Sequence, residues 1–108
     1  MSLFADYIKE RLGKQVLEDD HGFVTYFFES DYVYVEDVYT RPESRREGKL
    51  YKMVDQVAEI AKEKGVHKML GSVVPSANSS TESLHVLLDY GFKLYSSDKN
   101  IIYFMKEI

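Results

Sequence analysis

A short segment of the chain combines the residue types that bind anions. Residues 45–49 are Arg-Arg-Glu-Gly-Lys, and they follow a strand-like run and precede a run with helical spacing. A turn that leads from a strand into a helix exposes unpaired amides, and the helix dipole adds partial positive charge. Gly48 lets the backbone approach a ligand because it has no Cβ atom. We therefore predict a site for a phosphate-bearing anion such as pyrophosphate.

The same segment also fits a purely structural helix start. Ser44 and Glu47 have the spacing of a capping box, in which the helix begins at Arg45 and its first amides are satisfied internally. Gly48 would then lie inside the helix, at a cost of about 1 kcal/mol relative to Ala. Spacing alone leaves both interpretations open.

The residues on either side of this turn indicate the elements that hold it. Residues 32–39 have the aromatic and β-branched composition of a strand. Apolar residues recur at helical spacing from Leu50 to Ala61, and Gly65 fits the end of that helix. Further helices are expected at residues 3–12 and before Gly91. Further strands are expected at residues 15–18, 23–29, 66–74, 92–95 and 101–105.

The last third of the chain gives three finer expectations. Ser79 and Glu82 have the spacing of a capping box at the start of the last helix. Residues 96–100 are expected to form the turn of a final hairpin. Three leucines of the last helix are expected to face the core: Leu84, Leu87 and Leu88.

The order of these elements predicts the fold class. The helix between residues 32–39 and 66–74 should form a right-handed crossover between two parallel strands, while the flanking hairpins are antiparallel. We expect an α/β (α+β) fold with a mixed, mostly antiparallel sheet around a central parallel strand pair, flanked by helices. A chain of 108 residues is typical of a single domain, here residues 1–108.

Two segments carry a resemblance to a known family. Residues 45–50, Arg-Arg-Glu-Gly-Lys-Leu after Thr-Arg-Pro, resemble motif A of the GNAT superfamily of N-acetyltransferases, whose pattern is R/Q-x-x-G-x-G/A. Residues 83–92 resemble the motif B helix of that family, which typically ends in Gly-Phe. With the order of elements, the resemblance covers nearly the whole chain, although the family's usual first strand and part of its first helical region are missing.

The resemblance implies acetyl-CoA as co-substrate and a GNAT fold whose central parallel strands splay apart. It places the pantetheine arm between these strands, with backbone contacts at the end of the first one. An amide near Val38 would polarise the thioester carbonyl. The implied cofactor-binding residues are Val38, Tyr39, Thr40, Arg45, Arg46, Glu47, Gly48, Lys49, Leu50 and Tyr51.

The chain departs from the family pattern at two positions. Leu50 stands where Gly or Ala is usual, so its side chain either narrows the phosphate site or turns into the core. Leu87 stands where many members carry the Tyr that protonates the leaving thiolate. Tyr90 and Tyr95 are the candidates to supply a hydroxyl instead.

The reaction that the resemblance implies needs a base, because an amine must lose a proton before it attacks the thioester. Glu36 and Asp37 lie on the strand that forms the floor of the family's site. Since successive strand residues point to opposite faces, we expect only one to face the acceptor, and we favour Glu36. Alternatively, both are solvated or paired with Arg41 or Arg45.

Composition excludes several other classes. The absence of Cys rules out disulfides, thiolate catalysis and Cys-ligated zinc, and three His without a carboxylate cluster make a metal site unexpected. A net charge of −4 argues against a nucleic-acid-binding surface. No apolar run approaches the roughly 20 residues of a membrane span, and no leader is recognisable, so we expect a cytoplasmic protein.

The leading hypothesis is an acetyl-CoA-dependent N-acetyltransferase that acts on a primary amine of a small molecule or a protein. The first alternative is a non-catalytic acyl-CoA-binding or regulatory module on the same fold, which Leu87 motivates. The second is a small interaction domain whose sheet edge pairs with a partner or with a second copy, so a homodimer is one expected state.

Overall fold

The computed structural model describes residues 2–77 and 80–108, except the side chains of residues 80–82. The order of elements predicted from the sequence is confirmed in these residues. The elements are α1 (Leu3–Leu12), β1 (Gln15–Glu18), β2 (Gly22–Phe28), β3 (Val33–Thr40), the short 3-10 helix η1 (Pro42–Ser44), α2 (Lys49–Glu63), β4 (Lys68–Val73), α3 (Ser80–Tyr90), β5 (Lys93–Asp98) and β6 (Ile101–Glu107).

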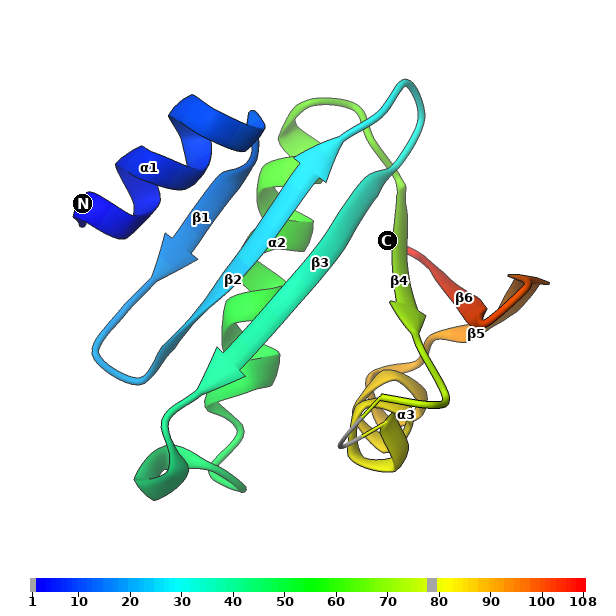
Figure 1. The fold of residues 1–108 in the computed structure, drawn as a ribbon. Helices are drawn as coiled ribbons and strands as arrows, with labels where there is room; N and C mark the ends of the chain where they lie inside the picture. Colours follow the sequence, from blue (N-terminus) through cyan, green and yellow to red (C-terminus); the bar gives the residue numbers. More distant parts are fainter. Residues whose placement is uncertain (1, 78–79) are drawn as a thin grey trace.

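The strands form one sheet in the order β1-β2-β3-β4-β6-β5. Each neighbouring pair is antiparallel except β3 and β4, which are parallel. The parallel ladder is short, because only Val33 pairs with Met69 and Tyr34 with Leu70. Beyond these pairs the two strands diverge, as Figure 1 shows. The predicted central parallel pair and its splay are both confirmed.

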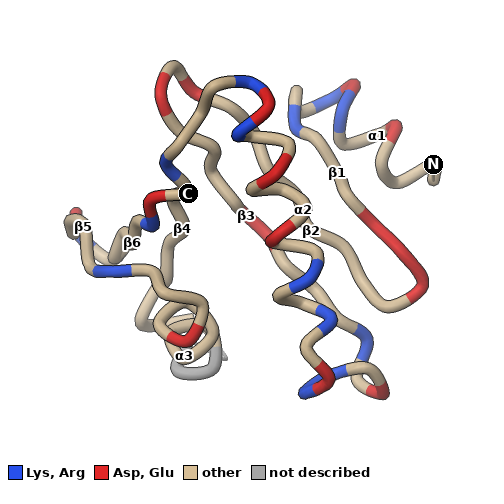
Figure 2. The backbone as a smooth tube through the Cα atoms, turned by 180° about the vertical axis from the view of Figure 1, so that it is seen from behind, with Lys and Arg blue, Asp and Glu red and all other residues tan. Residues whose placement is uncertain are grey.

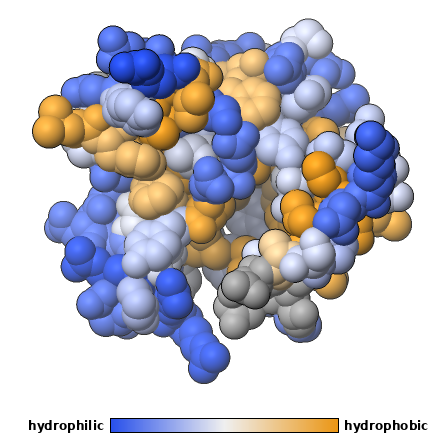
Figure 3. Space-filling view, viewed as in Figure 1, coloured by the Kyte–Doolittle hydropathy of each residue, from blue (hydrophilic) through white to orange (hydrophobic). Residues whose placement is uncertain are grey.

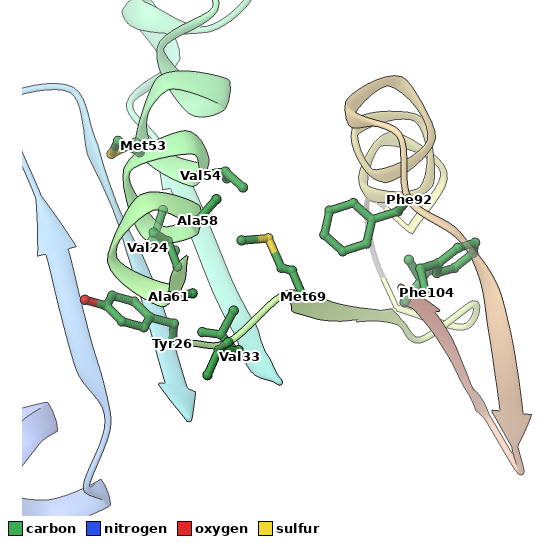
Figure 4. Packing of buried hydrophobic residues seen from close by; sticks show 13 residues of the cluster. Val24, Tyr26, Val33, Met53, Val54, Ala58, Ala61, Met69, Phe92 and Phe104 are labelled. Carbon is green, nitrogen blue, oxygen red and sulfur yellow. The ribbon is translucent and has the colours of Figure 1, made fainter. Parts of the chain in front are cut away.

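The core lies between the sheet and two helices that cover the same face. Val24 and Val33 of the sheet lie close to Ala58 and Ala61 of α2 (Figure 4) and belong to the same buried cluster. Met69 belongs to the same cluster, and Gly71, two residues further on β4, faces α3. Since residues two apart on a strand share a face, α2 and α3 lie side by side over it.

The first helix covers the opposite face of the sheet. The ring of Phe4 on α1 lies 5.0 Å from the ring of Phe23, whose side chain alternates with that of the buried Val24. α1 buries little apolar surface on this face, because Leu3, Tyr7 and other apolar side chains of the helix stay exposed. No helix in the described part of the chain is long and apolar enough to cross a membrane.

The finer expectations for the last third need correction. Leu88 is 49% exposed, because α3 lies on β4 through the i, i+3 stripe of Leu84 and Leu87. The final turn is shorter than predicted: Ser97 and Asp98 pair with β6, so only Lys99 and Asn100 remain between the strands. The predicted capping box starts at Ser79, which lies outside the described residues.

Candidate functional site

The start of α2 decides between the two interpretations of the glycine turn. The helix begins at Lys49, with Gly48 at its N-cap in the left-handed region (φ 78°) and without a side-chain cap. Ser44 is buried in the preceding short helix, and its Oγ atom lies 2.9 Å from Nδ1 of His21. The capping-box interpretation is therefore wrong, because the helix starts four residues later and Ser44 has another partner.

The turn leaves a continuous row of free amides. The N–H of Arg45 donates to the carbonyl of Pro42 at 3.3 Å, and the next bonded amide is that of Lys52, which donates to Gly48 at 3.3 Å. The six N–H groups from Arg46 to Tyr51 donate to no residue that the structure describes. Arg46, like Gly48, is in the left-handed region, with φ 66°. Such alternating conformations form concave amide nests that bind anions.

These amides open onto a groove of about 770 Å³. The groove runs from the first turn of α2, between the diverging strands β3 and β4, to α3. The space-filling view is hollowed where these strands part (Figure 3). Several predicted cofactor-binding residues line it: Val38, Tyr39, Thr40, Arg45, Arg46, Gly48, Lys49, Leu50 and Tyr51.

The edge of β3 presents free backbone groups to this groove. The N–H of Arg41 donates to His21 at 2.7 Å, which makes the facing pair Gly22–Thr40 a non-hydrogen-bonded one. By alternation Val38 is in the same position, so the amides of Val38 and Thr40 are directed away from β2, toward the gap. The amide of Tyr39 is directed toward β2. In addition, Oγ1 of Thr40 is buried and has no hydrogen-bond partner among the described residues.

A hydrogen bond marks the point where the strands separate. The hydroxyl of Tyr34 on β3 donates to Oγ of Ser72 on β4 at 2.5 Å, next to the last ladder pair. Burial raises the pKa of the Tyr34 phenol above its ordinary value of 10.0, so this hydroxyl remains a donor to a higher pH than that of an exposed tyrosine. Neither residue was a candidate from the sequence, since nothing in their spacing links them.

Lys and Arg residues are concentrated at the turn between β3 and α2, together with some Glu residues (Figure 2). Arg45 is directed back to the strand: its Nε donates to the carbonyl of Thr40 at 2.9 Å, and its guanidinium lies 5.8 Å from the ring centre of Tyr39. Lys49 lies 3.8 Å from a carboxylate oxygen of Glu47. Arg46 has no ion pair in the described part of the chain, so its charge remains available for an anion.

The two departures from the family pattern have different consequences. Leu50 packs against the core, so its side chain turns inward and leaves the amides open. Leu87 lines the groove above Gly71, where a Cβ would come within 3.2 Å of Cδ2 of Leu87. Tyr90 also lines the groove, but its hydroxyl donates to Asp55 on α2. Tyr95 is 59% exposed on β5 and lies outside the groove.

The two candidate carboxylates occupy a bulge in β3. Thr25 faces Asp37 and Tyr26 faces Val35, so Glu36 is an extra residue without an opposite partner. The bulge breaks the strict alternation of side chains, and Glu36 and Asp37 line one cavity of about 290 Å³ beneath α1. Both carboxylates therefore border the cavity beneath α1, and which of them faces the acceptor stays a prediction.

Each carboxylate has a partner that the sequence did not indicate. Glu36 forms an ion pair with Lys14 rather than with Arg41 or Arg45. Asp37 accepts a long hydrogen bond from Oγ1 of Thr25, and its own amide donates to the same oxygen at 3.0 Å. Glu36 also lines the large groove, so it lies where the two cavities meet. Among the described residues, no group of three His, Asp or Glu side chains is placed to hold a metal ion.

The model of the acetyltransferase (GNAT) family matches residues 8–92. No curated protein matches the chain by sequence.

Solved structures show the same fold at low sequence identity. A GNAT-family protein from Desulfovibrio desulfuricans is 13% identical with a TM-score of 0.80, and the match covers 94% of this chain and 76% of that one. An acetyltransferase from Elizabethkingia anophelis with acetyl-CoA bound is 16% identical with a TM-score of 0.72, covering 95% and 82%.

A third similar structure is the PaiA N-acetyltransferase from Thermoplasma acidophilum in complex with coenzyme A. It is 17% identical with a TM-score of 0.73, and the match covers 82% of this chain. The chain spans about half of the length of that protein, with 54% covered.

Proposed function

We propose that this chain, which belongs to the acetyltransferase (GNAT) family, transfers an acetyl group from acetyl-CoA to a primary amine of a small molecule or a protein. The observation that carries this proposal is the row of six free amides from Arg46 to Tyr51, which opens onto the groove between β3 and β4. Backbone donors at a helix N-terminus suit a diphosphate.

The unsatisfied polar groups along the groove fit the rest of coenzyme A. The amides of Val38 and Thr40 face a gap in the sheet, where a ligand with its own amide groups can complete the strand pairing. The buried Oγ1 of Thr40 lacks a partner in the described part of the chain, and a polar ligand atom would supply one. When bound, acetyl-CoA supplies an acetyl group activated as a thioester.

Glu36 is the proposed general base. It lies where the groove meets the smaller cavity, so a carboxylate there reaches both an acceptor under α1 and the acyl end of the groove. Glu36 accepts a proton from the acceptor ammonium, and the neutral nitrogen then forms a bond to the acetyl carbon as the carbon–sulfur bond breaks. The sulfur leaves with the electron pair of that bond and takes up the second proton that the nitrogen loses. Asp37 lines the same cavity and is the second candidate.

A second candidate function is acyl-CoA binding without turnover. It is favoured by Leu87, which places an apolar side chain in the groove at the position of the usual acid, and by Tyr90, whose hydroxyl is held by Asp55. Because thiolate is a good leaving group, the loss of an acid slows transfer without abolishing it, and we retain the enzyme as the first proposal.

The two functions are separated by two measurements on the same protein. Calorimetric titration with acetyl-CoA and with CoA tests the groove, and a thiol-release assay over a panel of primary amines tests transfer. Saturable heat with thiol release supports the transferase. Saturable heat without release for any amine supports the binding module, and the absence of heat with either ligand contradicts both.

A further inference from the structure

The small cavity beneath α1 has an aromatic wall. The rings of Phe4, Phe23 and Tyr39 follow one another across α1, β2 and β3, with centre-to-centre distances of 5.0 Å and 5.7 Å. The planes of Phe23 and Tyr39 differ by 27°, so these two rings stack against each other. Ile8 and Leu12 continue the apolar lining along α1. An aromatic and aliphatic lining of this kind favours an apolar group in the ligand, and an aromatic ring can add ring–ring contacts.

The other end of the cavity is charged. Glu36 and Asp37 bring two carboxylates, and Lys14 brings one ammonium in contact with Glu36. At neutral pH this leaves one net negative charge. One ammonium group of a ligand balances that charge. If this group took the place of the Lys14 ammonium, it would contact Glu36 directly. A second ligand ammonium would lie in the cavity without a carboxylate of its own.

Glu36 is the charged residue that adjoins the large groove. With Val38 and Tyr39 it lines both cavities, whereas Lys14, Asp37, Phe4 and Ile8 line only the smaller one. A ligand with its ring on the aromatic wall and its ammonium at Glu36 therefore directs the nitrogen toward the groove. The volume of about 290 Å³ is close to the lower end of the roughly 300–1,000 Å³ of small-molecule pockets, which suits a small acceptor.

We propose that this cavity selects an arylalkyl monoamine, that is, one ammonium group joined by a short alkyl chain to an aromatic ring. The inference rests on the proposed function, because it names the acceptor class of the same site. Lys14 sets the charge of the cavity and thereby excludes diamines.

The test compares phenethylamine with cadaverine in the thiol-release assay. The wild-type protein is expected to give a kcat/KM for phenethylamine that is at least about tenfold higher. Lys14→Met removes the ammonium that offsets one of the two carboxylates. The ratio of kcat/KM for phenethylamine to kcat/KM for cadaverine should therefore fall about tenfold. Lys68→Met is the matched control: Lys68 pairs with Asp31 at 3.7 Å outside both cavities, and its removal should keep the wild-type ratio.

Binding is measured separately, so that failure of this inference and failure of the proposed function are distinguishable. In amide NMR spectra, phenethylamine should shift the resonances of Phe23, Glu36 and Tyr39 whether or not turnover occurs. Shifts without thiol release for any amine support the cavity assignment and contradict the transferase. Equal kcat/KM values for the two amines, an unchanged ratio in Lys14→Met, or thiol release without shifts at these residues would overturn the inference.

Discussion

Gly48 and Gly65 stand at opposite ends of α2 with the same φ of 78°, and a Cβ built on either meets no atom within 4 Å. A side chain at either position is therefore strained by the backbone rather than blocked by a neighbour. The two residues differ in their amides: that of Gly65 donates to Lys62 at 3.0 Å, whereas that of Gly48 is one of the six free donors.

This pair gives the first prediction. Gly48→Ala and Gly65→Ala should each lower the free energy of unfolding by about 1–2 kcal/mol, as measured by urea denaturation. Only Gly48→Ala should weaken CoA binding, by about tenfold or more, because its strain displaces amides that face the ligand. Calorimetry with CoA that finds the same affinity in both variants would show that the turn does not hold the diphosphate.

The second prediction concerns the base. Glu36→Gln should lower kcat about 100-fold or more while the affinity for CoA stays unchanged, because the variant keeps the size of the side chain and loses the proton acceptor. Asp37→Asn is the matched control, with a loss below about tenfold. Steady-state thiol release measures both. A larger loss in Asp37→Asn would assign the base to the other carboxylate.

The third prediction restores a hydroxyl at the usual position of the acid. Leu87→Tyr should raise kcat about tenfold, because a phenol in the groove can protonate the departing thiolate. Since Leu87 lies 3.2 Å from the Cβ position of Gly71, the larger side chain must turn away from β4, into the groove. Leu87→Phe has the same bulk without the hydroxyl and should not gain rate; an equal gain in Leu87→Phe refutes acid catalysis by the new Tyr.

The fourth prediction is a pH dependence of stability. Burial, reinforced by the hydrogen bond to Asp55, raises the pKa of Tyr90 above its ordinary value of 10.0. Above pH 10 the unfolded chain therefore releases a proton that the folded chain keeps, so folding loses stability as pH rises, by at most about 1.4 kcal/mol per pH unit.

Tyr90→Phe removes this contribution. The difference in free energy of unfolding between the wild type and the variant should be constant from pH 7 to about pH 9 and should shrink above about pH 10. Urea denaturation over this range measures it. A difference that stays constant into the alkaline range means that the phenol ionises alike in both states.

The spacing of apolar residues predicted the architecture, because the burial of these residues determines how the helices and strands pack. The apolar stripe of α2, with Met53, Val57 and Ala61, could be inferred from helical spacing, and these residues form the core. The free amides could be anticipated from Gly48, since a left-handed N-cap excludes most other residues. Leu88 was misassigned, because spacing within a helix does not show how wide a face its neighbour covers.

The acceptor side could not be predicted in the same way. The bulge at Glu36 adds one residue to a strand, and no local pattern marks which residue is extra. The ion pair of Glu36 with Lys14 and the hydrogen bond of Tyr34 with Ser72 join residues 22 and 38 positions apart. Such contacts depend on strand register, which the composition of each strand leaves open.

In the proposed function, the six amides from Arg46 to Tyr51 complete their hydrogen bonds with a diphosphate. The most direct measurement is an amide NMR titration with CoA, with pantetheine as the control that lacks phosphate. CoA should cause large downfield shifts at these six amides, whereas pantetheine should leave them unchanged and shift the amides of Val38 and Thr40. Saturating CoA that leaves the six resonances in place would contradict the proposed function.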